Sequence, residues 1–362
     1  MGQYSRAYGF EEALKIRRPA TNDMAIRMGV ISPDRIILHN YPIGNPISAF
    51  NAGAVYLQEI DALKLYVRII LGYYMYVSYI AELTVPLDDV FDGYINTNRY
   101  TGDIVIYPST KYDVWGTEDP RVYELDGQLF MTYTGRSINY FNPRVYKNRT
   151  LPVTAVYNKE LKTWVKKYVF VLSEEKFPET ISNKDAFLHK TGNGEFYLFH
   201  RPHFSDDEFF LFISKIDKDE LTHDGAGIKE VKIESAIEVL EPSPFESKLG
   251  WASPPINIDK DRAIVFVHAV DSDLVVYRVF ALLLRLSKEE VVIEAVTPRY
   301  IMEPRHPYEL VGDRPLTIFP CGSVKIDENT IVMTYGAGDF MVGIALISLN
   351  EVLSELDNGR IY

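Results

Sequence analysis

The sequence predicts an all-β chain folded as a five-bladed β-propeller with short terminal helices. From about Ile36 onward, short runs rich in β-branched and aromatic residues alternate with turn residues. Four of these runs, at residues 130–135, 196–201, 264–269 and 331–336, end in a small or hydrogen-bonding residue and recur about every 65 to 70 residues. That interval is typical of one four-stranded blade per repeat, and residues 55–80 supply a fifth unit.

The alternative all-β arrangement is a pair of stacked β-sandwich domains. Two such domains would be joined by a linker, and no stretch rich in Gly, Ser or Pro divides this chain into halves. We therefore expect one propeller domain over residues 36–350. Residues 1–35 are predicted to form an N-terminal helical extension, and residues 351–362 a C-terminal helical tail.

The two terminal helices are predicted from local patterns. Residues 10–18 place apolar Phe10 and Leu14 four positions apart, with acidic residues first, basic residues last and Pro19 after them. Residues 351–356 form a second short helical pattern before Asn358-Gly359. Whether the N-terminal helix mediates assembly of a homo-oligomer is left open.

Composition limits the partners and the compartment. The 362 residues include 50 acidic and 38 basic ones, a net charge of -12, so the surface should repel nucleic acid. A single cysteine, Cys321, excludes an internal disulfide framework and a cysteine-based zinc site, and no residue spacing predicts a metal site. The first ten residues lack the apolar core of a secretory signal. We expect a cytoplasmic protein.

The apolar stretch at residues 62–83 is predicted not to span a membrane. Lys64 and Arg68 interrupt it, and charges at a bilayer centre are costly. We expect two buried strands there, at residues 65–70 and 74–81.

The segment Gly116-Thr117-Glu118-Asp119-Pro120-Arg121 is the first candidate for chemistry. It leads into an alternating run and an Asp126-Gly127 pair, the signature of a β-hairpin. Since proline cannot donate to a β-ladder, Asp119 is expected just before the strand, with its carboxylate facing a cavity. The structural alternative is an Asp-Pro turn in which Asp119 pairs with Arg121.

The other repeat units carry polar residues at equivalent strand ends. Because the innermost strands of a propeller surround a central channel, these residues should converge on one pocket. In chain order they are Asn51, Arg68, Glu118, Asp119, Arg121, Lys184, Asp185, His200, Arg201, His268 and Asp339. The structural alternatives are core positions for His200 and His268, a solvated Lys184, and an ion pair between Arg201 and Asp185.

Short motifs in this set, taken in order, resemble those of glycoside hydrolase family 130, the β-mannoside phosphorylases and related mannosidases. They are Glu118-Asp119-Pro120-Arg121, His200-Arg201-Pro202, Ser253-Pro254-Pro255, Val267-His268-Ala269, and Phe319-Pro320-Cys321-Gly322 followed by Tyr335-Gly336-Ala337-Gly338-Asp339. The resemblance covers roughly residues 45–350 and implies a five-bladed propeller, in agreement with the repeats.

The resemblance also implies an activity. Asp119 occupies the position of the family's general acid. Inorganic phosphate is already an anionic nucleophile, so no second carboxylate is needed to activate it. Phosphate is a co-substrate, and no cofactor is implied. A desolvated phosphate needs cations, for which the candidates are Arg149, Lys184, Arg201 and His268. The β-mannoside oligosaccharide would be bound by Asn51, Arg68, Glu118, Arg121, His200 and Asp339.

Two short motifs and two loops depart from the family pattern and leave questions open. Asn51-Ala52-Gly53-Ala54 and Val267-His268-Ala269 each replace family residues. The loop at residues 136–150 is longer than expected and carries Arg136, Arg144 and Arg149, so the phosphate-binding arginine is undecided. A polar loop at residues 85–110 is expected beside the acceptor site, and the acceptor sugar and its linkage stay open.

Three functions are therefore compared. The first is an inverting phosphorylase that converts a β-mannoside and phosphate to mannose 1-phosphate. The second is a β-mannoside hydrolase of the same family, which would not need Arg149, Lys184 and His268. The third is a non-catalytic sugar-binding propeller.

Overall fold

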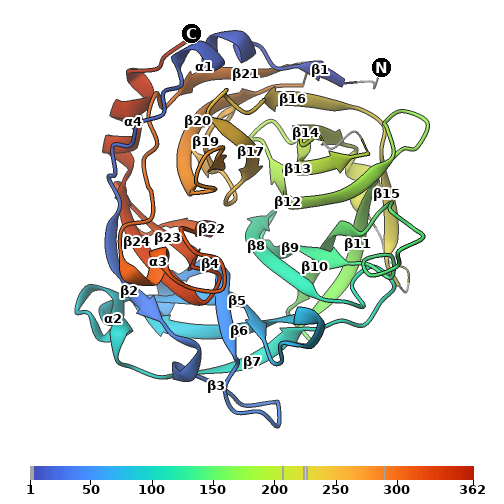
Figure 1. Cartoon of the computed structure of the whole chain (residues 1–362). Coiled ribbons are helices and arrows are strands. Elements are labelled where there is room, and N and C mark those ends of the chain that lie inside the picture. The colour runs from blue at the N-terminus through green and yellow to red at the C-terminus, as the bar shows by residue number, and fades with distance from the viewer. Residues whose placement is uncertain (1–3, 206–207, 223–224, 226, 289) are drawn as a thin grey trace.

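Five groups of mostly antiparallel strands surround a common centre in the computed structural model (Figure 1). The structure describes residues 4–362 apart from 206, 207, 223, 224, 226 and 289. The prediction of a mostly β chain is confirmed. The strands nearest the centre are β4, β8, β12, β17 and β22, one in each group (Figure 1).

The first two groups come from the first half of the chain. Group 1 pairs, from the centre outward, β4 (Ser48–Leu57), β5 (Ala62–Ile70), β6 (Ser78–Pro86), β7 (Tyr100–Ile106) and β3 (Ile36–Leu38). Group 2 pairs β8 (Thr117–Leu125), β9 (Gln128–Arg136), β10 (Thr150–Asn158), β11 (Thr163–Leu172) and β15 (Lys229–Ile233).

The remaining groups follow around the centre. Group 3 pairs β12 (Thr180–Lys190), β13 (Phe196–Phe204), β14 (Leu211–Ile216), β16 (Ala236–Leu240) and β1 (Tyr4–Arg6). Group 4 pairs β17 (Glu246–Trp251), β19 (Arg262–Asp271), β20 (Tyr277–Leu286) and β21 (Val291–Val296), with β18 (Ile256–Asn257) also on β19. Group 5 pairs β22 (Ile318–Lys325), β23 (Thr330–Ala337), β24 (Met341–Ser348) and β2 (Ile26–Ile31). One bridge, Thr150 to Ser182, joins groups 2 and 3.

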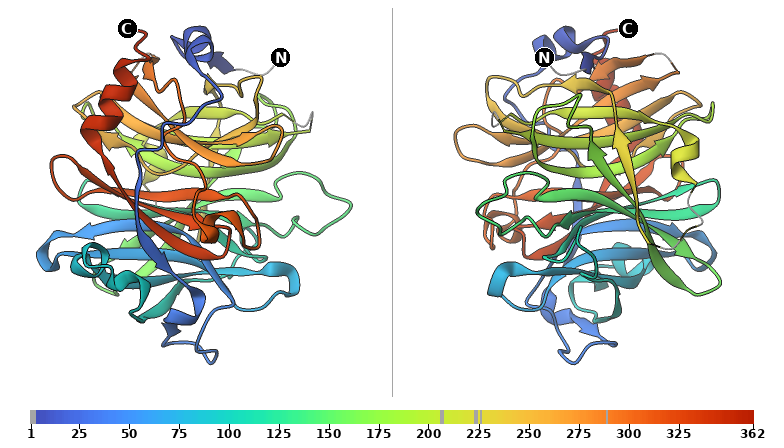
Figure 2. Two further views of the ribbon diagram at one scale, coloured as in Figure 1. Left: turned by 60° about the vertical axis from the view of Figure 1, so that its left-hand side comes forward. Right: turned by 90° about the vertical axis from the view of Figure 1, so that its right-hand side faces the viewer.

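Both terminal helices are present, as α1 (Phe10–Ile16) and α4 (Leu349–Asp357), and both chain ends lie along one outer edge (Figures 1 and 2). The N-terminal region contributes more than the predicted helix. Its β1 pairs with β16 in group 3, and its β2 pairs with β24 in group 5. Because β2 completes group 5 with a segment far away in sequence, it closes the ring.

Short helices lie in the connections. They are α2 (Leu87–Phe91), α3 (Pro307–Leu310), and the 3-10 turns η1 (Pro33–Arg35), η2 (Gln58–Ile60), η3 (Tyr74–Tyr76), η4 (Tyr94–Asn96) and η5 (Lys218–Leu221). The prediction of a strand at residues 74–81 was wrong at its start. Met75 and Tyr76 take positive φ angles of 57° and 52°, which breaks an extended conformation, and β6 begins at Ser78.

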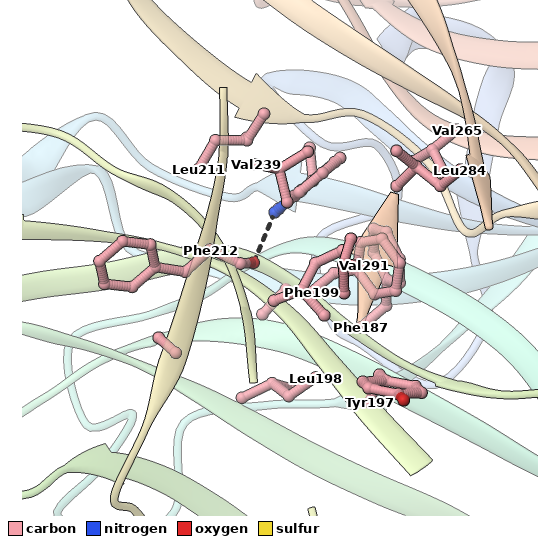
Figure 3. Close-up of a cluster of buried hydrophobic side chains, with 14 of the residues drawn as sticks. Phe187, Tyr197, Leu198, Phe199, Leu211, Phe212, Val239, Val265, Leu284 and Val291 are labelled. Carbon is pink, nitrogen blue, oxygen red and sulfur yellow. Dashed lines mark hydrogen bonds between the residues drawn. The ribbon is translucent and has the colours of Figure 1, made fainter. Parts of the chain in front are cut away.

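Aromatic and aliphatic side chains fill the contacts between groups. Figure 3 shows part of the largest cluster, where side chains of groups 3 and 4 meet. The Phe187 and Phe199 rings stack with centroids 4.9 Å apart, and Trp251 packs edge-on against Phe199 at 4.9 Å. The Trp251 indole also donates to the carbonyls of His200 and Phe212, at 3.2 and 3.0 Å. This packing fixes β17 against β13, two strands that carry residues of the site described below.

Among the described helices, none has the length and apolar character needed to cross a membrane. Residues 62–83 contain β5, the 3-10 turn η3 and the first part of β6, so no α-helix forms in this stretch.

Candidate active site

One cavity of about 240 Å³ collects residues from all five groups. It is lined by Asn51, Arg68, Asp119, Ser182, Lys184, Arg201, Phe209, Lys248, His268, Tyr277, Arg314, Phe319 and Asp339. Seven of these were predicted from the sequence to gather in one pocket: Asn51, Arg68, Asp119, Lys184, Arg201, His268 and Asp339. A larger cavity of about 570 Å³ lies elsewhere, at the edge of β11 and β15, and contains none of the predicted residues.

Asp119 lies inside strand β8, not before it as predicted. The pairing of β8 with β9 shifts register between Glu118 and Arg121, and Asp119 takes a positive φ of 51° within this bulge. Pro120 is tolerated there because a residue within the bulge does not need to donate a backbone hydrogen bond to the neighbouring strand. The distortion turns the Asp119 carboxylate into the cavity. The Asp126-Gly127 hairpin at the other end of β8 is confirmed, since Leu125 pairs with Gln128.

Three cationic or donor groups surround the buried Asp119 carboxylate. Oδ1 accepts hydrogen bonds from Asn51 at 2.7 Å and Arg68 at 2.8 Å, and Lys184 Nζ lies 3.6 Å from Oδ2. Burial raises the pKa of Asp119, but the charges of Arg68, Lys184 and Arg121 and the Asn51 hydrogen bond outweigh burial and lower it well below its usual range. Asp119 is therefore ionised in the unliganded protein.

Glu118 shares these cations. Arg68 donates to it at 2.8 Å, Lys184 Nζ lies 3.8 Å away, and Arg136 Nε lies 3.6 Å away. Glu118 is buried but is not among the lining residues. It acts on the cavity through Arg68 and Lys184, which it holds beside Asp119.

Asp185 connects three residues of the predicted set. The predicted ion pair with Arg201 is present, with Arg201 Nε 2.6 Å from Oδ2, and Arg121 and His268 lie at 3.4 and 3.6 Å. Burial opposes ionisation of Asp185, but Arg201, His268, Arg121 and Lys184 together lower its pKa well below the usual range. This buried carboxylate fixes the orientation of Arg201 and His268 on the cavity wall.

His268 is neutral near pH 7, because burial lowers its pKa to about 3. Its ring packs on Phe319 with centroids 4.4 Å apart, and its buried Nδ1 has no hydrogen-bond partner in the described structure. Gly250 makes the contact with Asp185 possible. A Cβ at that position would lie 2.3 Å from His268 Nε2 and 2.6 Å from Asp185 Oδ2.

Two predicted sugar-binding residues, Arg121 and His200, lie behind the cavity wall. Arg121 donates to the carbonyls of Asp119, Trp251 and Ala252 at 2.8, 3.1 and 3.0 Å. His200 lies between Asn183 and Ser214, and burial lowers its pKa to about 3. The side chains of both residues are fully enclosed by protein partners.

None of the three arginines of the loop at residues 136–150 lines the cavity. Arg136 donates to the Tyr76 carbonyl at 2.9 Å, and Arg144 is exposed. Arg149 lies over Tyr140 and Tyr146, and its Nε is buried without a hydrogen-bond partner in the described structure. Its backbone N–H donates to Ile181 O, next to the lining residue Ser182.

Three residues that were not predicted add positive charge and a hydroxyl to the cavity. Lys248 Nζ and Arg314 Nη1 both donate to the Tyr277 hydroxyl, at 3.3 and 2.7 Å. Neither cation forms an ion pair with a carboxylate of the described residues. Burial and the charges of Arg201 and Lys184 lower the pKa of Lys248 to about 7. Of the three, Lys248 is the residue that the sequence could have indicated, because it lies five residues before the Ser253-Pro254-Pro255 motif.

Asp339 is the second carboxylate on the cavity wall. It has a positive φ of 50°, and its carbonyl accepts a hydrogen bond from Ser48 at 3.0 Å. Burial raises the pKa of Asp339 to about 6, against the charges of Arg68 and Arg314, which lower it. This side chain therefore exchanges a proton near neutral pH.

Comparisons with known proteins identify the family of this chain. A family model described as beta-1,4-mannooligosaccharide phosphorylase matches residues 15–358. A beta-1,2-mannobiose phosphorylase of Thermoanaerobacter sp. (strain X514) is 30% identical over 72% of this chain and 76% of its own length. A 1,2-beta-oligomannan phosphorylase of the same organism is 29% identical over 84% of this chain and 91% of its own length.

Solved structures are similar in fold. A beta-1,2-mannobiose phosphorylase from Listeria innocua, in complex with beta-1,2-mannobiose, aligns with a TM-score of 0.66 at 17% identity, over 92% of this chain and 99% of that one. A mannose phosphorylase from Leishmania mexicana, in complex with phosphate ion, aligns with a TM-score of 0.57 at 12% identity, over 90% of each chain. The predicted family and enzyme class are confirmed: the chain belongs to glycoside hydrolase family 130, the β-mannoside phosphorylases, and is a glycoside phosphorylase of that family.

Proposed function

We propose that this protein is an inverting phosphorylase that transfers the terminal mannose of a β-mannoside to inorganic phosphate, giving mannose 1-phosphate. The proposal includes a five-bladed β-propeller whose blades are groups 1 to 5, formed by residues 36–350 together with β1 and β2 of the N-terminal region. The observation that carries the activity is the cavity itself. Its Asp119 side holds a buried carboxylate, and its Tyr277 side holds two cations that form no ion pair with a carboxylate of the described residues.

The proposed linkage is β-1,2. Both curated relatives above act on β-1,2-mannosides by name, whereas the family model is named for β-1,4-linked substrates. The linkage therefore rests on likeness in sequence, and both isomers belong in the assay.

In the proposed reaction, phosphate occupies the Tyr277 side. Lys184, Arg201, Lys248 and Arg314 supply positive charge there, Tyr277 supplies a hydroxyl, and neutral His268 supplies a ring nitrogen. Cations held in place by protein contacts bind a phosphate dianion more strongly than free side chains do, because no reorganisation is needed. A role for Arg149, whose backbone N–H donates to Ile181 in the strand of Ser182, stays a prediction.

The bond changes are those of one displacement. A phosphate oxygen attacks the anomeric carbon, the bond from that carbon to the leaving oxygen breaks, and the leaving oxygen takes a proton that originates on Asp119. The proton passes through a sugar hydroxyl. Asp119 must first be protonated, and phosphate bound beside Lys184 would offset the charge that lowers the Asp119 pKa. Sugar binding is proposed for Asn51, Arg68 and Asp339, while Arg121 and His200 would position the wall behind them.

Hydrolysis is the second candidate, because Asp339 offers a second carboxylate. An inverting hydrolase uses one carboxyl group as acid and another as base for water. It does not need Lys248 and Arg314, which would then be cations without function.

The experiment is the cleavage of β-1,2- and β-1,4-mannobiose with and without added phosphate. The proposal expects mannose 1-phosphate, formed only with phosphate, and at least about a hundredfold slower from Asp119→Asn. Release of two equivalents of free mannose in phosphate-free buffer would favour the hydrolase.

A further inference from the structure

We infer that the connection between β5 and β6, residues 71–77, binds the second sugar of the leaving oligosaccharide, so that this enzyme prefers β-mannosides longer than the disaccharide. The inference rests on the proposed function, since the position of the leaving group follows from it.

The cavity is too small for the whole reacting complex. Its volume of about 240 Å³ lies below the range of about 300 to 1,000 Å³ typical of pockets that enclose a small ligand. The transferred mannose and the phosphate would fill it. Further sugars of an oligosaccharide must then lie outside, on the rim.

The geometry of inversion selects one side of the rim. Phosphate attacks from the face opposite the leaving group. With phosphate on the side of Tyr277, the leaving sugar lies on the side of Asp119, which groups 1 and 2 build. Residues 71–77 connect β5 and β6 of group 1, residues 137–149 connect β9 and β10 of group 2, and both loops project from the same side of the ring in the left view of Figure 2.

Arg136 contacts both loops and also lies beside Glu118. Its Nε lies 3.6 Å from Glu118, beside the proposed acid, and its Nη1 donates to the carbonyls of Met75 and Tyr76 at 3.3 and 2.9 Å. Its guanidinium also lies 3.8 Å from the centre of the Tyr140 ring. Tyr76 is fixed from a further direction, since its hydroxyl donates to Asp313, the neighbour of Arg314, at 2.7 Å.

The loop holds a backbone conformation that is unfavourable by itself. Met75 and Tyr76 both have positive φ angles, 57° and 52°, which cost on the order of 1 kcal/mol or more for residues with side chains. The contacts of Arg136 and Asp313 stabilise this conformation. As a result, the Tyr73 and Tyr76 rings lie roughly parallel with centroids 6.3 Å apart, and Tyr73 and Tyr74 are 59% and 84% exposed.

Exposed tyrosines on a fixed loop suit a sugar ligand. A tyrosine presents a flat apolar face, on which the C–H groups of a pyranose can pack, and a hydroxyl at its tip. Tyr76 is held between Arg136, which lies 3.6 Å from Glu118, and Asp313, the neighbour of the lining residue Arg314, so we place the sugar next to the broken bond over Tyr76. The following sugar reaches Tyr73 and Tyr74.

The test compares substrates of different length in the variant Y73A/Y74A. We expect kcat/KM for β-1,2-mannotriose and mannotetraose to fall about twofold to tenfold, the range for loss of an aromatic contact, with little change for mannobiose. Tyr94→Ala is the matched control, because Tyr94 is 54% exposed and lies in the connection at the opposite end of β6. An equal loss for all three substrates, or no loss for any, would overturn the inference.

A second measurement separates this inference from the proposed function. Calorimetric binding of mannotetraose and mannobiose to Asp119→Asn, with and without the two tyrosines, needs no turnover. If the tyrosines strengthen binding of the tetrasaccharide alone, the subsite stands even when phosphate proves not to be the co-substrate. If they affect neither ligand, the subsite is wrong even when phosphorolysis is established.

Discussion

Charged side chains are paired differently on the two sides of the cavity. On the Asp119 side, the charges of Asp119 and Glu118 are paired: Arg68 bridges the two carboxylates, and Lys184 lies near both. On the Tyr277 side, Lys248 and Arg314 share one phenol oxygen and have no carboxylate partner among the described residues. Since burying unpaired charge is costly, a fold retains such a site where a ligand completes it. We infer from this difference that the Asp119 side serves proton transfer and that the Tyr277 side binds an anion.

The largest expected effect comes from removing the acid. Asp119→Asn keeps the shape and one hydrogen-bond acceptor for Asn51 and Arg68 but holds no transferable proton. We expect kcat/KM to fall by about a hundredfold to ten-thousandfold, the range for loss of a general acid. Asp126→Asn, at the exposed far end of the same hairpin, serves as the control and should leave the rate unchanged. A rate for Asp119→Asn within a factor of three of the wild type would contradict the assignment.

Truncating the anion side should weaken phosphate specifically. Lys248→Met removes a hydrogen-bond donor to the anion, for which about 1.5 to 3 kcal/mol is typical, so the KM for phosphate should rise roughly tenfold to 150-fold. The KM for the oligosaccharide should change little. Lys325→Met, on the exposed end of β22, is the control. An equal rise in the KM values for phosphate and for the oligosaccharide would contradict the distinction between the two sides.

Two glycines allow each side to be disturbed separately. A Cβ at Gly336 would lie 1.8 Å from Asn51 Oδ1 and should push Asn51 away from Asp119, whereas a Cβ at Gly250 would push His268 away from Asp185. We expect Gly336→Ala to lower kcat about tenfold and Gly250→Ala to raise the KM for phosphate by a similar factor. Steady-state kinetics with each substrate varied gives both constants, and melting temperatures show whether either variant is only unstable. Identical kinetic changes would mean that the sides do not act independently.

The smallest effect is a pH dependence on the phosphate side. Because the pKa of Lys248 is lowered to about 7, the side chain loses its proton as the pH rises through 7, and one positive charge is lost from the site. The kcat/KM for phosphate should therefore fall about fivefold between pH 7 and pH 8. Lys248→Arg stays charged and should lack this step, while the ionisation of phosphate itself affects both proteins alike. If the fall in kcat/KM between pH 7 and pH 8 persists in Lys248→Arg, another group causes it.

The sequence predicted the carboxylate side better than the anion side, for a physical reason. Asn51, Arg68, Asp119 and Asp339 each follow or belong to a recognisable strand end, and equivalent strand ends meet in a ring. Lys248, Tyr277 and Arg314 come from a strand, a strand start and a loop with no shared local pattern. Only the packing of groups 4 and 5 brings them together.

Alternation along a strand explains why one predicted residue, His200, lies behind the wall. His200 and Arg201 are adjacent in β13, so their side chains point to opposite faces, and only Arg201 reaches the cavity. This rule was available from the sequence. By contrast, the β-bulge that directs Asp119 inward and Arg121 behind it depends on the register between β8 and β9, which no single segment reveals.

The most direct test of the division is the position of phosphate in a crystal of the protein soaked with phosphate and mannose. The account predicts an anion within hydrogen-bond distance of the Tyr277 hydroxyl, Lys248 and Arg314, with mannose between it and Asp119. An anion bound only at the loop of residues 137–149, or a cavity that holds sugar but no phosphate at saturating concentration, would contradict it.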